Sequence, residues 1–85
     1  MTLPSTRSLE MFRAVSEAGS FRGAAKHLGL SPSTVSKAIA DLEARLGTRL
    51  ITRTTRQLAL TEAGVAYQAS VATALDALGE GAEMV

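Results

Sequence analysis

The sequence predicts a small, mainly α-helical fold in which three helices precede a two-stranded β-hairpin and a long fourth helix. Three observations predict it: apolar residues recur at helical spacing, capping residues and glycines divide that pattern into segments, and the spacing becomes strand-like late in the chain. With 85 residues, 46% of them hydrophobic and 20% charged, the chain has the length and composition of one small globular domain.

The first helix is expected at about residues 6–18. Leu9, Phe12 and Val15 follow one another in steps of three, which places them on one face of a helix. Gly19 can end the helix, since glycine readily adopts the left-handed conformation found at helix C-termini.

A second, shorter helix is expected from Phe21 to about Leu28. Ser20 can cap its start, because a serine side chain accepts a hydrogen bond from a backbone amide of the first turn. Gly29 ends it, and the short segment that follows brings the next helix close to this one.

Ser31 and Pro32 begin a third helix over about residues 32–46, because a capping hydroxyl followed by proline is typical of a helix start. Its apolar residues form one amphipathic stripe: Val35, Ala38, Ile39, Leu42 and Leu46. Two helices joined by a tight turn that contains glycine form a helix-turn-helix, here about residues 21–40. The second helix of such a pair is placed to enter the major groove of DNA.

Two short β-compatible runs surround a polar segment and predict a hairpin, or wing, at about residues 49–60. Thr61 can cap a final helix that has the acidic Glu62 in its first turn, where the helix dipole favours a negative charge. The predicted fold is therefore mainly α, a winged helix-turn-helix over residues 4–61 followed by a linker or dimerisation helix over residues 62–85.

Positive charge is concentrated in the middle of the chain, although the formal net charge is only +1. Residues 22–56 hold seven of the nine lysines and arginines and two of the eight acids, whereas residues 57–85 hold four acids and no lysine or arginine. A basic segment suits a polyanion, because each phosphate contact releases counterions. The alternative is that these charges only solvate helix faces.

Small hydroxyl side chains and a lysine occupy the N-terminal half of the third helix, and a serine and an arginine begin the second. Small side chains let a helix approach DNA closely, and hydroxyls donate to phosphates or base edges. Helix N-terminal amides can also face a phosphate. The alternative for the hydroxyls is capping and solvent exposure, above all for Ser31. The candidate DNA-binding residues on these helices are Ser20, Arg22, Ser31, Pro32, Ser33, Thr34, Ser36 and Lys37.

Two arginines, Arg53 and Arg56, lie in the expected wing. An arginine at a wing tip suits a phosphate or the minor groove, so both are candidate DNA contacts. Arg53 can instead pair with Glu43 inside the fold, and the sequence leaves both interpretations open.

The last helix carries an apolar seam with steps of four, three, four and three residues: Val71, Leu75, Leu78, Ala82 and Val85. Such heptad spacing suits pairing with a second chain and predicts a homodimer. The alternative is that the seam docks on the chain's own core. Gly79 and Gly81 weaken the helix here and, with the absence of a C-cap at the chain end, favour a piece of a longer protein.

Composition argues against several classes of site. The absence of cysteine excludes disulfides, thiolate zinc sites and a cysteine nucleophile, and the single histidine, His27, excludes a histidine metal cluster, so no metal and no cofactor are expected. No nucleophile–base pair or phosphate-binding glycine loop indicates an enzyme. No apolar run approaches the ~20 residues of a membrane span, and no signal peptide begins the chain, so a cytoplasmic location is expected.

Several motifs are spread over about residues 4–64: Phe12, Gly19-Ser20-Phe21, Ala24-Ala25, Leu28, Ser31, Val35-Ser36, Ile39, Leu42-Glu43, Leu46-Gly47, Leu50, Arg53, Arg56 and Leu60-Thr61-Glu62-Ala63-Gly64. Together they resemble the N-terminal DNA-binding domain of the LysR-type bacterial transcriptional regulators. The resemblance implies that the third helix contacts bases in the major groove, that Arg56 reaches the adjacent minor groove and that the last helix dimerises.

The same resemblance implies further partners. They are double-stranded DNA with an interrupted palindromic operator, a tetramer built from dimers in the full-length protein, and a small-molecule effector. The effector would bind a domain that these 85 residues lack.

Two positions depart from the family's pattern. Ile51 stands where the family usually has phenylalanine, a conservative core change. Lys37 stands where the family often has arginine, and lysine cannot form the same two-pronged hydrogen bond, which leaves base preference there open. A second function also stays open, a winged-helix module that binds another protein. Such a module should show little affinity for random duplex DNA even at low salt.

Overall fold

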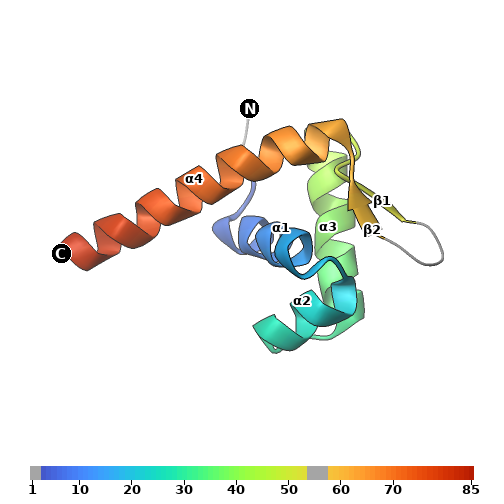
Figure 1. Cartoon of the computed structure of the whole chain (residues 1–85), viewed down its shortest axis with the longest axis horizontal. Helices are drawn as coiled ribbons and strands as arrows, with labels where there is room; N and C mark the ends of the chain where they lie inside the picture. The colour runs from blue at the N-terminus through green and yellow to red at the C-terminus, as the bar shows by residue number, and fades with distance from the viewer. Residues whose placement is uncertain (1–2, 54–57) are drawn as a thin grey trace.

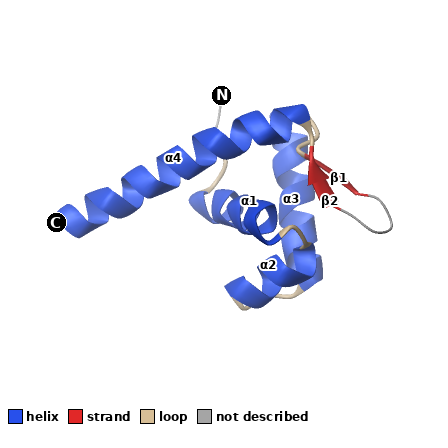
Figure 2. Cartoon of the chain, viewed as in Figure 1, coloured by secondary structure: helices blue, strands red, loops and turns tan. Residues whose placement is uncertain are grey.

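A computed structural model of the chain describes residues 3–53 and 58–85. Its elements in that part of the chain are α1 (Thr6–Ala18), α2 (Phe21–Leu28), α3 (Pro32–Leu46), β1 (Ile51–Arg53), β2 (Leu58–Leu60) and α4 (Glu62–Met84). The wing of β1 and β2 projects from one side of the helices, and the C-terminal part of α4 extends from the other (Figure 1). The predicted mainly helical winged fold is confirmed, and both strands found among the described residues belong to the wing (Figure 2).

Capping side chains set the limits of the helix-turn-helix. Ser20 Oγ accepts a hydrogen bond of 2.9 Å from the Gly23 amide at the start of α2. Ser31 Oγ accepts one of 3.2 Å from the Thr34 amide at the start of α3. Between them Gly29 has φ of 70°, the left-handed conformation that ends α2 and lets the chain turn sharply. These boundaries are the ones predicted from the sequence.

One apolar core joins the helices to the wing. Its buried members are Phe12, Val15, Ala24, Ala25, Val35, Ile39, Leu42, Leu50, Ile51 and Val71. The Phe12 ring lies 5.9 Å from the Tyr67 ring, centroid to centroid, so α4 packs across α1. Because Val71 belongs to this core, the N-terminal half of α4 is part of the same folded body as the helix-turn-helix.

Glu43 connects α3 to the wing. Its Oε2 accepts hydrogen bonds from the amides of Leu50, at 2.8 Å, and Ile51, at 3.1 Å. The two strands pair antiparallel, with Ile51 opposite Leu60 and Arg53 opposite Leu58. The carboxylate thus fixes where the wing begins relative to α3.

The start of α4 lies directly against the backbone that enters the wing. A Cβ atom on Gly64 would collide with the carbonyl oxygen of Leu50, so only glycine fits without a shift. The Thr61 amide donates to the same carbonyl at 2.9 Å, and the Thr61 hydroxyl donates to the carbonyl of Arg49 at 2.7 Å. Thr61 Oγ1 also caps α4 by accepting from the Gly64 amide, as the sequence predicts.

The apolar seam of α4 divides into two parts. Val71 is only 3% exposed, and Leu75 packs against the core. These two residues were predicted to contact a second chain, but they pack on the core of their own chain instead. Leu78 is 61% exposed, and Ala82 and Val85 are exposed as well. The helix continues to Met84, so the glycines at positions 79 and 81 do not end it.

Arg13 braces α4 against α1. Its guanidinium donates to Glu17 at 3.0 Å and to Asp76 at 2.8 Å. The hydrogen bond to Glu17 has the largest effect on Arg13 and the bond to Asp76 the next largest. Together they raise the pKa of Arg13 above its ordinary value. In the described part of the chain no helix, α4 included, is both long and apolar enough to cross a membrane.

Candidate nucleic-acid interface

The outward face of α3 combines one cation with small side chains. Its apolar stripe is turned inward, with Val35, Ile39 and Leu42 buried. The opposite face includes Ser33, Lys37, Ala40 and Ala44, with Asp41 one turn beyond Lys37, all exposed. Because the other neighbours of Lys37 on this face are serine and alanine, the helix axis can approach a ligand surface closely.

Three hydroxyls cluster at the start of α3. Ser31 Oγ lies 2.7 Å from Thr34 Oγ1 and 3.2 Å from Ser33 Oγ, within hydrogen-bonding distance of both. Each of these side chains is exposed, as is Pro32, whereas Ser36 is half-buried on the flank of the helix. A hydroxyl donates one hydrogen bond and accepts two, so the cluster can hold its own geometry and still contact a ligand.

The start of α2 offers one exposed cation. Arg22 is exposed, whereas Ser20 is half-buried and its hydroxyl accepts the capping bond from Gly23. Of the two candidates from this helix start, Arg22 is therefore the one whose side chain is directed to solvent.

Arg53 lies over the ring of Phe21, with its guanidinium carbon 4.4 Å from the ring centroid. Glu43 faces the amides of Leu50 and Ile51 instead, and among the described residues no ion pair joins it to Arg53. The Arg53–Glu43 pairing that the sequence left open is thus not found. Arg56 lies outside the described residues, and its contact with the minor groove stays a prediction.

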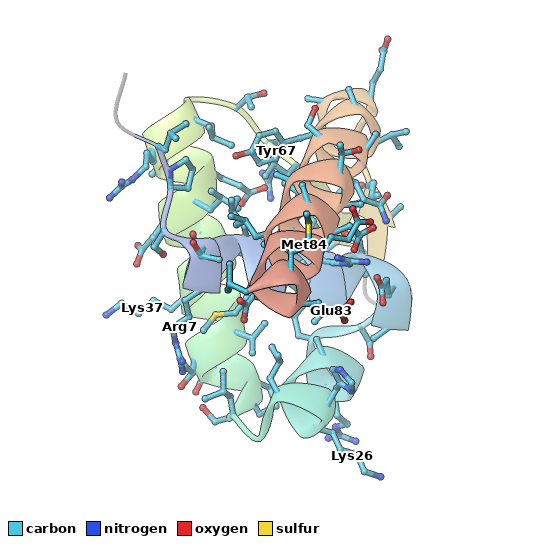
Figure 3. All side chains as sticks on the ribbon, turned by 90° about the vertical axis from the view of Figure 1, so that its left-hand side faces the viewer. Arg7, Lys26, Lys37, Tyr67, Glu83 and Met84 are labelled. Carbon is cyan, nitrogen blue, oxygen red and sulfur yellow. The ribbon has the colours of Figure 1, made fainter. Side chains whose placement is uncertain are left out.

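Two further cations, one on α1 and one near the end of α3, lie outside the predicted set of site residues. Arg7 and Arg45 line an open hollow of about 290 Å³ between α1 and α3, together with Met11 and Asp41. Figure 3 shows Arg7 on the same side of the molecule as Lys37, whereas Lys26 projects from the far end of α2 in another direction. Only the packing of α1 on α3 brings Arg7 there, so no local sequence pattern could have identified it.

The candidate residues fall into three groups. The side chains from Ser31 to Lys37 occupy the first two turns of α3, and Arg53 joins the wing to the start of α2 next to Arg22. The exposed part of the α4 seam lies at the end of the molecule opposite the wing (Figure 1). Within residues 3–53 and 58–85, no three histidine, aspartate or glutamate side chains lie close enough together to hold a metal ion.

Curated relatives match this chain along most of its length. An uncharacterized HTH-type transcriptional regulator of Mycobacterium bovis, Mb2303c, is 42% identical over 78 residues, which are 92% of this chain and 25% of that protein. The HTH-type transcriptional regulator CrgA of Neisseria meningitidis is 47% identical over 62 residues, 73% of this chain and 21% of that protein. The chain thus spans about a quarter of the length of such relatives.

Solved structures match the fold closely. The crystal structure of a CbnR_DBD–DNA complex superimposes with a TM-score of 0.90 at 34% identity, covering 95% of this chain and 93% of that chain. That of a BenM_DBD/benA site 1 DNA complex has a TM-score of 0.91 at 30% identity, covering 95% and 94%. Residues 6–65 match the family described as "Bacterial regulatory helix-turn-helix protein, lysR family". The chain therefore belongs to the lysR family of bacterial regulatory helix-turn-helix proteins.

Proposed function

We propose that this domain binds double-stranded DNA in a sequence-specific manner, with α3 in the major groove and the wing at the adjacent minor groove. The observation that carries the proposal is the outward face of α3, where Lys37 is exposed between Ser33 and Ala40, while Val35, Ile39 and Leu42 on the opposite face are buried in the core. A helix about 10 Å across fits the major groove, and small side chains let it enter deeply. Two similar structures are complexes with DNA, which supports DNA binding by this fold.

Each candidate residue has a chemical role in this arrangement. Lys37 donates to guanine acceptors or to a phosphate, and Thr34 offers its methyl group to thymine and its hydroxyl to a base edge. Ser33, Ser36 and the Ser31 hydroxyl donate to phosphates or base edges. Pro32 is exposed at the start of α3 beside the DNA, and the N-terminal amides of α2, which Ser20 caps, face a phosphate. The exposed Arg22 neutralises a phosphate, and Arg53 and Arg56 of the wing contact a phosphate or the minor groove.

The domain acts as a homodimer in this proposal. Leu78, Ala82 and Val85 are the exposed members of the α4 seam, and they are spaced to pair with the same helix of a second chain. A two-fold dimer presents two α3 helices to two half-sites, so its operator is an interrupted palindrome. Since the relatives are transcriptional regulators of about four times this length, the whole protein is proposed to regulate transcription. A tetramer and a response to an effector are what the family resemblance implies for it.

Salt-dependent titration of a duplex tests DNA binding directly. Affinity for a random-sequence duplex should fall steeply between about 50 and 200 mM salt, because phosphate contacts release counterions. Lys37→Ala should weaken binding by about 1–3 kcal/mol, whereas Lys26→Ala, which removes the same charge from the far end of α2, should have little effect.

Two results would contradict the proposal. No binding at low salt would favour the alternative, a winged-helix module that recognises a protein. Equal losses from Lys37→Ala and Lys26→Ala would mean that net charge alone drives the association and that α3 has no special role.

A further inference from the structure

The contact between Arg53 and Phe21 links the end of β1 to the start of α2 at the edge of the shared core. Arg53 is the last residue of β1 and Phe21 is the first residue of α2, yet the guanidinium carbon lies 4.4 Å from the ring centroid. Phe21 is half-buried, and its side chain packs against the core. The core therefore fixes the ring, and the guanidinium group of Arg53 lies over one of its faces. This geometry is that of a cation–π contact.

The strand register explains why Arg53 points back over the protein. Side chains alternate along a strand, so Arg53 shares the face of the buried Ile51, while Thr52 points outward and is exposed. The residue opposite Arg53 in the wing is Leu58, which also packs against the core. Arg53 therefore lies on the face of the wing that is turned toward the core, next to the last apolar contact of that face.

Stacking leaves the hydrogen-bonding capacity of an arginine largely intact. The N–H groups of a guanidinium lie in its plane and point outward from its edge, whereas the ring contacts only its flat face. A stacked arginine is thus held in place and still able to donate to a phosphate. Holding it before DNA arrives reduces the side-chain entropy that binding would otherwise cost.

We propose that Phe21 is a positioning residue for DNA binding, whose ring holds Arg53 beside the start of α2. There Arg53 and the exposed Arg22 form a joint contact for the DNA backbone, one arginine from the wing and one from the helix-turn-helix. The inference rests on the proposed function, because it assigns a role within DNA binding.

A double-mutant cycle on DNA affinity tests the coupling. Phe21→Leu keeps an apolar side chain in the core but removes the aromatic face, and Arg53→Gln removes the cation. Phe21→Leu should weaken binding about two- to five-fold, the equivalent of one cation–π contact, and should have no further effect once Arg53→Gln is present. Arg53→Gln should also make the plot of log affinity against log salt concentration less steep, by the equivalent of about one released counterion. Phe21→Tyr retains the aromatic face and should bind as the unmodified domain does.

The matched control replaces the neighbouring arginine. Phe21→Leu combined with Arg22→Gln should give additive losses, because the cation that stacks on the ring is Arg53. A purely structural role of Phe21 would lower the melting temperature and would make the losses additive with Arg53→Gln too, which would overturn the proposal.

A second measurement needs neither DNA nor a folded Phe21→Leu variant. Protons above an aromatic ring are shifted upfield, so the side-chain NMR signals of Arg53 should lie upfield of those of Arg49, an exposed arginine at the start of the wing. The shift should persist in Phe21→Tyr. Arg53 signals that coincide with those of Arg49 would overturn the positioning role even if the domain binds DNA. The upfield shift without DNA binding by the unmodified domain would overturn the proposed function, and with it the role of the contact.

Discussion

The carboxylate of Glu43 accepts a hydrogen bond of 2.8 Å from the backbone amide of Leu50, and this bond ties the last turns of α3 to the segment that enters the wing. The same oxygen accepts a second bond, of 3.1 Å, from the amide of Ile51. Both bonds are part-buried, and Leu50 and Ile51 are core residues. One side chain therefore holds the wing in a fixed position relative to the helix proposed to enter the major groove.

Removing this carboxylate should destabilise the domain. Glu43→Ala leaves two part-buried amides without their acceptor, at an expected cost of about 1–3 kcal/mol, because unmade hydrogen bonds of buried groups carry their desolvation penalty. Thermal unfolding followed by circular dichroism measures the loss. Asp41→Ala, an exposed acidic residue on the same helix, removes the same charge and should change the melting temperature little. Equal effects of the two substitutions would show that the Glu43 bonds do not stabilise the fold.

A methyl group at position 64 should also destabilise the domain. Gly64→Ala directs a Cβ at the carbonyl oxygen of Leu50, which is backbone and cannot rotate away, so a cost of about 1–3 kcal/mol is expected. Gly81→Ala is the matched control, because nothing lies near a Cβ at that position of the same helix. It should stabilise α4 by up to about 1 kcal/mol through helix propensity. Chemical denaturation of both variants should give opposite signs, and a stabilised Gly64→Ala variant would contradict the close approach.

Asp76 should hold the middle of α4 against α1. Asp76→Ala removes the partner of Arg13 at 2.8 Å, so the backbone amides of α4 beyond this position should exchange hydrogen faster. Hydrogen exchange measured by mass spectrometry or NMR checks the prediction. Glu80→Ala, one turn further along the same helix and exposed, removes a carboxylate that has no bond to Arg13 and should not speed the exchange of these amides. If both variants exchange alike, the Arg13–Asp76 bond does not brace the helix.

The exposed half of the α4 seam should control assembly. Leu78→Asp places a charge where the proposed dimer buries an apolar side chain, so a dimer should become a monomer while the melting temperature of the monomer stays similar. Val65→Asp is the control, since Val65 is an exposed apolar residue of α4 outside the seam. Sedimentation or light scattering reports the mass. A Leu78→Asp variant that still assembles as the unmodified domain does would remove the seam from the interface.

Most of the fold could be predicted because the signals for it are local. Ser31 followed by Pro32 begins α3, and Gly29 ends α2 in the left-handed conformation, at the positions expected. The inward stripe of α3 follows from its 3.6-residue period alone. The elements of the helix-turn-helix are thus encoded by capping and periodicity within a few residues of each boundary.

The remaining features depend on contacts between distant segments. Heptad spacing assigns Val71 and Leu78 to the same seam, but the contacts of α4 with the core and with α1 extend to Leu75 and Asp76, so Val71 is buried and Leu78 is exposed. The direction of Arg53 could have been inferred by counting alternate residues from the buried Ile51, but its partner Phe21 is brought there by tertiary packing. The role of Glu43 as an acceptor for the wing amides likewise has no signature in spacing.

Selection of binding sites from a randomised duplex library, with the unmodified domain beside Lys37→Ala, tests the central claim most directly. The account predicts an enriched interrupted palindrome for the unmodified domain and a changed preference at specific base pairs for Lys37→Ala, because Lys37 is the cation on the outward face of α3. Salt-sensitive binding with no enriched sequence in either selection would contradict sequence-specific recognition by α3.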